Sequence, residues 1–490
     1  MPLLALLILV PAAAGLACLP ARSRGLPAAL GVLAFGVTLG LGIALAAGVL
    51  ARGAVTEWNG FLCADALSAW MVLVISVVSL ASAIYAAGYL RRELAEGAVT
   101  ARRYREFYVL NPLFGASMFL VVLANNPGVM WFAVEATALS SVLLVALYNR
   151  RTSLEAAWKY MILGSLGLAL ALMGTVFLYA AACKNNTEPP PSFNWPYLMS
   201  VANQLDPRLL KLAFVFALIG YGTKAGLAPM HTWLPDAHSE APSPTSAMLS
   251  GVSLKIALYA LLRFHILTTA CLGTGYSAHL ILGFGLFSMC VAAPFILVQT
   301  NMKRLFAYHS LEHIGIICAG IGLSAPLAVF AAVLHIGYHA LVKATIFFAA
   351  GNVHQKCHTL ELPSLAGLLK TMPATAVLLA LALVGIAGLP PFGIFLTEFS
   401  MVAGGIGAGH ILASVLFVAA LAVVFAGLLS HAAHLLLGTP KKEPTGPQTP
   451  PTCVAAMALL IAVLAVFSFW LPAPLLELLR RAAAIIGGSR

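Results

Sequence analysis

Apolar stretches of about 20 residues follow one another along nearly the whole chain, and short polar or basic segments separate them. A helix of that length crosses the hydrocarbon core of a bilayer, which is about 30 Å thick. The pattern predicts an all-α polytopic membrane protein with about fourteen transmembrane helices. We place the spans near residues 2–20, 26–50, 66–90, 108–125, 128–148, 156–181, 210–230, 243–264, 277–297, 303–323, 326–350, 374–400, 408–437 and 453–472. A short amphipathic tail at 475–486 is expected to lie in the membrane interface.

Composition agrees with a membrane location. Hydrophobic residues make up 61% of the chain and charged residues only 9%, whereas soluble proteins are roughly 25% charged. A soluble domain so poor in charge could not cover its own surface, so no soluble enzyme domain is expected. The apolar N-terminal segment lacks the basic residues that open a signal peptide, and we interpret it as the first span.

The net charge of +11 comes from basic residues scattered over short loops, which does not favour a nucleic-acid partner. Loops after odd-numbered spans carry roughly twice as many Lys and Arg residues as loops after even-numbered spans. The positive-inside rule then predicts a multi-pass protein of a prokaryotic cytoplasmic (inner) membrane with both termini outside. The eight cysteines form no C-x-x-C pair, so we expect no metal site and no cofactor in this chain.

Ionisable side chains occur within several of the predicted spans. Each costs about 2.5–3.5 kcal/mol at the bilayer centre, so such a residue usually marks an ion pathway or a buried partner. The main candidates for a proton pathway are Glu135, Lys224, Lys255, His335, His339, Lys343 and Glu398. Any one of them alone could be a locally paired structural charge, but so many in consecutive spans favour a pathway.

His335, His339 and Lys343 are spaced i, i+4 and i+8 in the eleventh span, so they share one helix face about 6 Å apart along the axis. Histidine titrates near neutral pH and can accept a proton on one nitrogen while releasing it from the other. The lysine ammonium would repel a bound cation. The spacing therefore favours a proton relay over a metal site.

Two predicted spans are interrupted by Gly and Pro next to a charged residue. Gly226 and Pro229 follow Lys224, and the second interruption precedes Glu398. The residues of the second break are Gly388, Pro390, Pro391 and Gly393. Broken helices at membrane depth are tolerated where they line a wet cavity, and paired interruptions are typical of inverted-repeat transporters.

One shift along the sequence relates the ionisable residues of the two halves. A shift of about 175 residues maps Glu135 onto Glu312, Lys159 onto His335, Lys224 onto Glu398, and Lys255 onto His431. Five spans separate the copies, an odd number, so the second copy must be upside down. We therefore divide the chain into spans one to three (1–107), a first five-helix repeat (108–265), a second, inverted five-helix repeat (277–437), and the last span with its tail (453–490).

These motifs resemble the antiporter-like subunits shared by respiratory complex I, multisubunit sodium/proton antiporters and membrane-bound hydrogenases. The most specific stretch is TKAGLAPMHTWLPDAHSEAPSPTSAMLSG, and the similarity extends strongly over roughly residues 60–400. Within the family, AYHSLEHIGII is more similar to the large antiporter-like subunit of group-four nickel–iron hydrogenases and formate hydrogenlyase. The resemblance implies other membrane subunits as partners and, through them, a soluble redox arm, with no redox chemistry in this chain.

The resemblance also implies roles for individual residues. Glu135 would pair with Lys224, and Lys255 would be the second lysine of the row. The His-x3-His-x3-Lys run and Glu398 would continue the row towards an exit. As a hypothesis, separation of the Glu135–Lys224 pair sends a proton along this row. Further candidates for the pathway are Lys159, His309, Glu312, His313, Asp236, His238 and His431.

Some of these further candidates have a second interpretation. Asp236 and His238 could collect protons from the cytoplasm or could serve only in capping and loop hydrogen bonds. His431 could extend the exit or simply pack.

Three other functions remain open at this point. A metal-dependent membrane hydrolase could use His231, Asp236 and His238, or His354, Cys357 and His358, but neither set has a familiar ligand spacing. A stand-alone sodium/proton antiporter would need oxygen ligands such as aspartates within the spans. A coupling subunit of an inorganic-carbon uptake complex would use the same relay to drive a soluble partner.

Overall fold

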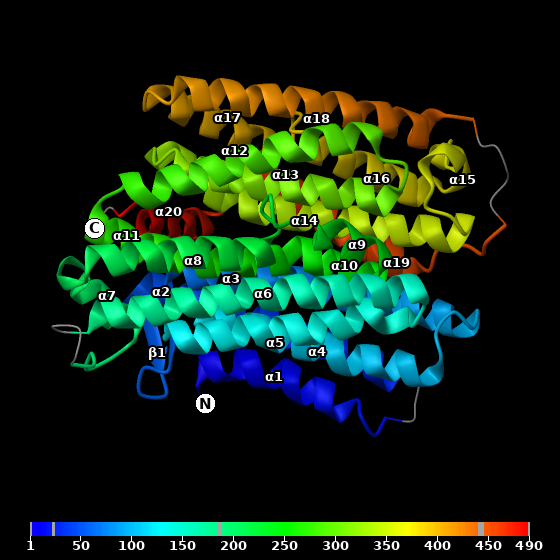
Figure 1. The fold of residues 1–490 in the computed structure, drawn as a ribbon. Coiled ribbons are helices and arrows are strands. Elements are labelled where there is room, and N and C mark those ends of the chain that lie inside the picture. The colour runs from blue at the N-terminus through cyan, green and yellow to red at the C-terminus, as the bar shows by residue number, and fades with distance from the viewer. Residues whose placement is uncertain (1, 22–24, 184–187, 440–444, 489–490) are drawn as a thin grey trace.

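The computed structural model describes residues 2–21, 25–183, 188–439 and 445–488, and these form one bundle of mainly long helices (Figure 1). The helices of the N-terminal half are α1 (Leu3–Ala17), α2 (Leu26–Arg52), α3 (Ala66–Ala95), α4 (Ala101–Leu123), α5 (Pro127–Val145), η1 (Ala146–Tyr148), α6 (Arg151–Ala182), α7 (Trp195–Ser200), η2 (Ala202–Gln204), α8 (Pro207–Ala225) and α9 (Trp233–Glu240). Those of the C-terminal half are α10 (Ser243–Met248), the π-helix η3 (Leu249–Ser253), α11 (Leu254–Leu272), α12 (Gly275–Val298), α13 (Met302–Gly322), α14 (Pro326–Cys357), η4 (Leu362–Ser364), α15 (Leu368–Thr371), α16 (Pro373–Ile386), α17 (Gly393–Gly407), α18 (Ile411–Leu437), α19 (Pro451–Phe469) and α20 (Ala473–Gly487).

Within the described residues, ten helices are long and apolar enough to cross a membrane. Three shorter apolar helices, α1, α16 and α17, accompany them. The prediction of a multi-pass, mainly helical membrane protein is therefore confirmed. The two strands, β1 (Val55–Glu57) and β2 (Leu62–Ala64), form a small antiparallel hairpin at one end of the bundle. A Glu57 carboxylate oxygen in this hairpin accepts hydrogen bonds from the first-turn amides of Leu4 and Ala5, and so caps α1.

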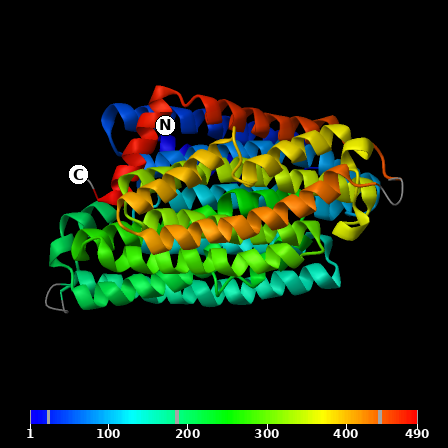
Figure 2. The ribbon, with the colours of Figure 1, turned by 90° about the horizontal axis from the view of Figure 1, so that it is seen from above.

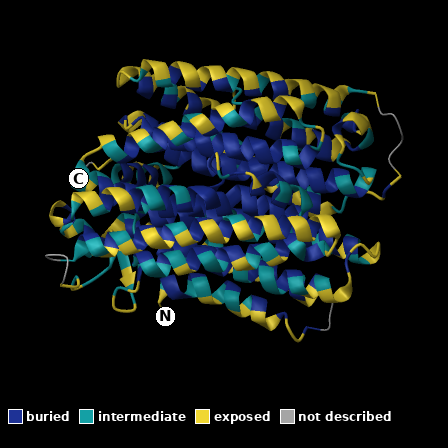
Figure 3. Cartoon of the chain, in the orientation of Figure 1, coloured by how far each residue is buried: buried dark blue, intermediate teal, exposed yellow. Residues whose placement is uncertain are grey.

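Burial is distributed as a bilayer requires. The centre of the bundle is buried, while the outer helices expose one stripe each (Figure 3). α14 is buried over most of its length, whereas α18 exposes large apolar side chains such as Ile411, Leu412 and Val415. Such a surface would be unfavourable in water but suits contact with lipid or with another membrane subunit.

Both helix breaks lie where the sequence predicts them. α8 ends at Ala225, Gly226 adopts a left-handed conformation with φ 79°, and α9 begins at Trp233. α16 ends at Ile386, Gly388 has φ 63°, and α17 begins at Gly393. Each break also contains a cis prolyl bond, at Pro229 and at Pro391.

Three features of the fold differ from the sequence prediction or extend it. α4 begins at Ala101 rather than near residue 108, because the Thr100 hydroxyl caps the amide of Arg103. α10, η3 and α11 form one continuous helical segment that contains a π-helix, which the sequence pattern did not indicate. The amphipathic tail is helical, as α20, and crosses the end of the bundle at a steep angle to the long helices (red in Figure 2).

Close packing of α6 against α8 generates a first prediction. A Cβ added at Gly220 on α8 would lie 2.6 Å from the Gly167 carbonyl oxygen of α6, whereas a Cβ added at Gly164 meets nothing within 4 Å. Gly220→Ala should therefore force the two backbones apart and destabilise the protein by about 1–3 kcal/mol, as overpacking does. Thermal unfolding in detergent would measure the effect, with Gly164→Ala as the matched control. Equal melting temperatures for the two variants would contradict the packing.

Candidate functional site

The ionisable residues predicted to form a row lie mostly in the buried centre of the bundle. Lys224 ends α8 just before the break, Lys255 begins α11 just after the π-helix, and Lys343 lies on α14. These three lysines are 1%, 1% and 0% exposed. His335 and His339, two turns and one turn before Lys343 on α14, are also fully buried. The structure therefore brings three helices, α8, α11 and α14, to one polar interior.

Each buried ammonium group donates to a neutral oxygen. Lys224 Nζ donates to the Tyr160 hydroxyl on α6, and Lys343 Nζ donates to the Phe306 carbonyl oxygen on α13. Lys255 Nζ donates to the Ser250 carbonyl oxygen at 2.5 Å. Ser250 belongs to η3, and a π-helix is wider than an α-helix and occurs preferentially at functional sites.

The predicted ion pair between Glu135 and Lys224 is not formed in this structure. Among the described residues these two side chains form no ion pair, and Oε2 of Glu135 is buried without a hydrogen-bond partner. Lys224 instead contacts Tyr160, whose ring stacks on Trp233 with centroids 4.4 Å apart. The Tyr160 hydroxyl also lies 2.8 Å from the Ser141 hydroxyl of α5, the helix that carries Glu135. Tyr160 thus stands beside the lysine as a neutral partner.

Two serines connect Lys255 with Lys343. The Ser250 hydroxyl lies 2.7 Å from the Ser310 hydroxyl on α13. Ser310 donates to the Phe306 carbonyl oxygen at 3.1 Å, and this is the oxygen that also accepts from Lys343. A polar connection therefore runs from the π-helix through α13 to the lysine of α14.

The histidines form a compact cluster between α13 and α14. His313 Nδ1 lies 2.9 Å from His335 Nε2, and His335 Nδ1 lies 2.8 Å from the Thr397 hydroxyl on α17. The rings of His313 and His339 stack with centroids 4.6 Å apart. Both nitrogens of His339 are buried without a partner from the chain. A neutral imidazole carries one donor and one acceptor, so His339 requires water or a moving proton carrier on at least one side.

Two carboxyl groups complete the cluster. Glu312 Oε2 lies 3.0 Å from His309 Nδ1 and 3.9 Å from His313 Nε2. Glu398 is 7% exposed and lies on α17, one turn after the second break. Both carboxyl groups line a cavity of about 380 Å³ that α16, α17 and α18 otherwise line with apolar side chains. Gly388 of the break also lines it, and a Cβ at Gly388 would overlap with the Glu398 carboxylate.

The same cluster contains two sets of atoms with the spacing of metal ligands. One set is His309, Glu312 and His313, and the other is His313, His335 and Glu398, with ligand atoms within 4.8 Å of one another. The nitrogens and oxygens are of the types that Zn²⁺ uses. Most of these atoms are already joined by the hydrogen bonds described above, and the absence of a metal in this chain stays a prediction.

Two of the further pathway candidates lie outside the buried row. Lys159 has a side chain that is 50% exposed and pairs with Glu155 at 2.8 Å and with Asp236 at 3.2 Å. His431 on α18 contacts the Ile296 carbonyl oxygen of α12 at 3.0 Å, which is a packing contact. The shift of about 175 residues found both of them by sequence offset. It could not show on which face of the helix each side chain lies.

Asp236 and His238 have different environments although both lie on α9. Asp236 is partly exposed and pairs with Arg304 at 2.5 Å as well as with Lys159. His238 is fully buried, with Nδ1 2.9 Å from the Leu234 carbonyl oxygen and Nε2 unpartnered. His238 therefore does not itself contact solvent, and its part in collecting protons stays a prediction. Its ring lies 6.4 Å from Trp233 and 5.4 Å from Phe347, between the surroundings of Lys224 and those of Lys343.

The hydrolase interpretation finds no geometric basis in the described part of the chain. Neither His231, Asp236 and His238 nor His354, Cys357 and His358 bring their ligand atoms together as a metal site requires. The structure also adds residues that sequence reasoning missed. Tyr160, Ser250, Ser310 and Thr397 all supply hydroxyl or carbonyl oxygens to the row.

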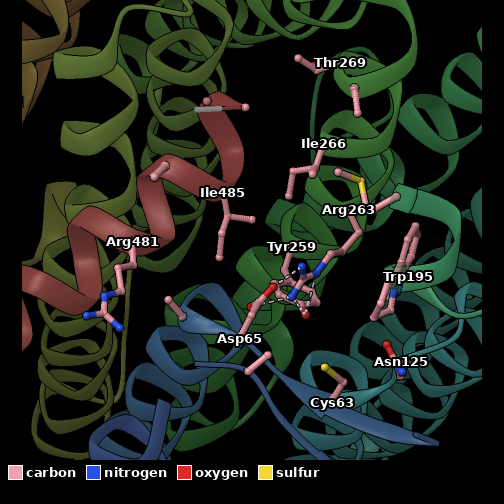
Figure 4. A pocket seen from close by; sticks show the side chains of 18 of the residues that line it. Cys63, Asp65, Asn125, Trp195, Tyr259, Arg263, Ile266, Thr269, Arg481 and Ile485 are labelled. Carbon is pink, nitrogen blue, oxygen red and sulfur yellow. Dashed lines mark hydrogen bonds and ion pairs between the residues drawn. The ribbon is translucent and has the colours of Figure 1, made fainter. Parts of the chain in front are cut away.

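A second cavity, of about 970 Å³, lies at one end of the bundle between α20, α11 and the hairpin (Figure 4). Asp65 and Arg263 form a bidentate ion pair at this cavity, at 2.6 and 2.8 Å. Burial raises the pKa of the Asp65 carboxyl, but the Arg263 guanidinium lowers it by more, so this pKa lies below its ordinary value and the pair stays charged. Asp65 also caps α3 by accepting from the Ser68 amide. This cluster ties α3 to α11, and its contacts are those of a structural ion pair.

Comparison with known proteins agrees with this architecture. Residues 124–424 match the family described as "NADH:quinone oxidoreductase/Mrp antiporter, TM", and residues 60–98 match "NADH-Ubiquinone oxidoreductase (complex I), chain 5 N-terminus". The fold is similar to a chain of the Mrp complex from a Dietzia species, with a TM-score of 0.86 at 22% identity over 98% of this chain and 96% of that chain.

Two curated relatives are components of one type of complex. The chain is 38% identical to the hydrogenase-4 component F homolog of Methylacidiphilum infernorum, over 79% of this chain and 81% of the relative. It is 29% identical to hydrogenase-4 component B of Escherichia coli, over 68% of this chain but only 49% of that protein. The chain therefore belongs to the NADH:quinone oxidoreductase/Mrp antiporter family of membrane subunits.

Proposed function

We propose that this antiporter-like membrane subunit translocates protons along its buried row, as part of a redox-driven membrane complex of the hydrogenase or complex I type. The proposed order is Lys224, Lys255, Lys343, the His313–His335–His339 cluster and Glu398. Family membership and the two hydrogenase-4 relatives support the type of complex. The order along the row rests on the contacts described above.

One observation carries the proposal. A continuous set of polar contacts runs from Lys255 through Ser250, Ser310 and the Phe306 carbonyl to Lys343. Close to its end lie Glu312 and the histidine pair, which leads to Thr397 next to Glu398. Three buried lysine side chains, for which the described part of the chain provides no carboxylate within 4.0 Å, are an expensive arrangement at membrane depth. Such an arrangement is consistent with a conduction path, where protons must bind and leave again.

We assign proton transfer between Lys224 and Lys255 to water molecules and to His238. His238 is buried between the aromatic rings next to Lys224 and Lys343, and its Nε2 has no partner from the chain. A buried water needs two to four polar partners, and these nitrogens and ammonium groups provide them. A proton leaving Lys224 would reach the second half of the row by this route.

Glu135 is the proposed point of coupling to a neighbouring subunit. It is partly exposed on α5, on the same face as Phe132 and Leu139, which are 61% and 56% exposed. A carboxylate on this face is disfavoured against lipid but suits contact with another membrane subunit. A change of charge or position next to Glu135 would alter the field at Lys224 and release its proton. A soluble redox arm would drive that change through the membrane partners.

Protons are favoured over sodium ions by the chemistry of the row. Na⁺ is bound by oxygen ligands, whereas the central positions here are lysine and histidine nitrogens. Imidazole and lysine amino groups accept and release protons, whereas their protonated forms repel a cation. A multisubunit sodium/proton antiporter is therefore the second candidate, supported by the similarity in fold to the Mrp complex.

The finer topology is also part of this proposal. Fourteen crossings would include the ten long apolar helices together with α1, α8, α13 and the α16–α17 pair. α8 and α13 fall short in apolarity because they carry the charged residues of the row and of the loop ends. The two broken helices support two inverted repeats at 108–265 and 277–437, between the segments 1–107 and 453–490. The basic odd-numbered loops support a cytoplasmic membrane with both termini outside.

Replacement of Lys224 tests the proposal directly. Lys224→Ala in the intact membrane complex should lower proton uptake into sealed vesicles by about a hundredfold, the scale of a lost proton-transfer group. Redox turnover should fall with it if the two processes are tightly coupled. Lys211→Ala is the matched control, because Lys211 lies on the same helix but is exposed. Wild-type proton uptake and turnover in Lys224→Ala would contradict the proposal and indicate that the buried row has only a structural role.

The second break supplies an independent prediction. Gly388→Ala should displace the Glu398 carboxylate and lower proton uptake at least tenfold, since a misplaced proton-transfer group loses much of its effect. Gly409→Ala is the control, because Gly409 has φ 83°, a similar backbone strain, but nothing within 4 Å of an added Cβ. Proton uptake measured for both variants separates the strain from the displacement. Equal losses of proton uptake in the two variants would contradict a role for Glu398 in proton transfer.

A further inference from the structure

A threonine next to Glu398 contacts the histidine pair from a different helix. Thr397 lies in the first turn and a half of α17, just after the second break, and is 1% exposed. Its hydroxyl lies 2.8 Å from His335 Nδ1 and donates to the Ile394 carbonyl oxygen, also at 2.8 Å. The oxygen therefore joins the broken helix to the relay on α14.

The number of hydrogens on each group limits which atom is the donor in the Thr397–His335 and His335–His313 hydrogen bonds. A threonine hydroxyl has one hydrogen, and the Ile394 carbonyl oxygen takes it. With that hydrogen on the Ile394 carbonyl, the hydroxyl oxygen accepts from His335 Nδ1–H; the opposite tautomer would require the hydroxyl to turn its hydrogen to His335 and leave the carbonyl. A neutral His335 with its hydrogen on Nδ1 has a free lone pair on Nε2, and His313 Nδ1–H then donates to it across 2.9 Å. In this arrangement one hydroxyl sets the tautomers of two histidines.

We propose that Thr397 is a positioning residue that holds the His313–His335 pair in the one tautomeric state ready to accept a proton from the Glu312 side. In this state both N–H bonds point from α13 towards α17, and the free lone pair is on His313 Nε2. That atom lies 3.9 Å from Glu312 Oε2 and has no hydrogen-bond partner. The inference rests on the proposed proton-translocating function and adds a residue that sets its direction.

The proton transfer that this arrangement prepares balances without any other reactant. A proton binds to His313 Nε2, and the Nδ1 hydrogen of His313 moves to His335 Nε2. His335 is then an imidazolium with hydrogen on both nitrogens; its Nδ1–H bond breaks, the proton goes to a Glu398 carboxylate oxygen to give the carboxylic acid, and both rings are left with hydrogen on Nε2. A nitrogen of His313, a nitrogen of His335 and an oxygen of Glu398 lie within 4.8 Å of one another. The pair must afterwards return to its starting tautomers, and the Thr397 hydroxyl favours that return.

An alternative explanation is purely local. Threonine in a helix often donates to its own backbone three or four residues back, with no further role. In that case the contact with His335 would be incidental, and removal of the hydroxyl would leave the imidazole tautomers unchanged. A measurement of the tautomers themselves therefore separates the two explanations.

The experiment compares Thr397→Val, which keeps the shape and removes the hydroxyl, with Thr397→Ser, which restores it. Solid-state ¹⁵N NMR of histidine-labelled protein in lipid, with the signal assigned by a His335→Gln sample, reports which nitrogen carries hydrogen. Wild type and Thr397→Ser should show His335 with hydrogen on Nδ1, whereas Thr397→Val should shift it towards Nε2. Proton uptake by the intact complex should fall by about three- to tenfold in Thr397→Val, the scale of one lost hydrogen bond.

Thr345→Val is the matched control, because Thr345 is equally buried on α14 and its hydroxyl donates only within its own helix, to the Leu341 carbonyl. It should leave the His335 signal and proton uptake as in wild type. An unchanged His335 tautomer in Thr397→Val would overturn the inference, even if proton uptake fell. A changed tautomer with normal uptake would overturn the assigned role in direction, while leaving the Lys224 experiment to decide the proposed function.

Discussion

Three lysine ammonium groups buried at membrane depth set the main physical constraint on this structure. Each needs an oxygen from the protein, since lipid offers none and an unsatisfied charge there would be prohibitive. The chain supplies these oxygens from a tyrosine, a π-helix carbonyl and a helix carbonyl of α13, to Lys224, Lys255 and Lys343 in turn. Because all of these partners are neutral, each ammonium is held without being locked into an ion pair.

The irregular parts of the helices lie next to these charged groups. The break after α8 follows Lys224, the π-helix precedes Lys255, and the break before α17 precedes Thr397 and Glu398. Regular helices satisfy their backbone groups internally, so a broken or widened helix is what brings polar backbone atoms to the interior. The surrounding helices bury this polar interior, and their outer faces remain apolar (Figure 3). The same irregular helices that define the fold therefore also supply polar atoms to the buried charged groups of the candidate pathway.

Much of this arrangement could be predicted from the sequence. The long apolar stretches predicted the helices, and Gly226 and Gly388 with their neighbouring prolines predicted the breaks. Spacing alone placed His335, His339 and Lys343 on one face, and all three are buried. Tyr160, Ser250, Ser310 and Thr397 were not predicted, because single hydroxyl groups are common in buried helices. Their partners lie on other helices, such as Thr397 for His335, and only the packed structure brings them together.

Two sequence-based expectations differ from the structure for a related reason. Lys159 was a further pathway candidate because of its position in a span, but it lies on the exposed side of α6 and pairs with Glu155 and Asp236. Lys224 was expected to pair with Glu135, yet Tyr160 on the intervening helix is its partner. Sequence offset and membrane depth identify candidate charges. They do not identify the face of the helix or the nearest oxygen.

The most direct test of the central claim is the number of protons moved per electron by the intact complex when Lys255 is replaced. Lys255→Met keeps an unbranched side chain one atom shorter than lysine and removes the ammonium at the middle of the row. Lys159→Met removes an exposed ammonium outside it, as the control. The account predicts that Lys255→Met translocates few or no protons per electron, while Lys159→Met keeps the wild-type ratio. An unchanged ratio in Lys255→Met would contradict a proton path through the buried row.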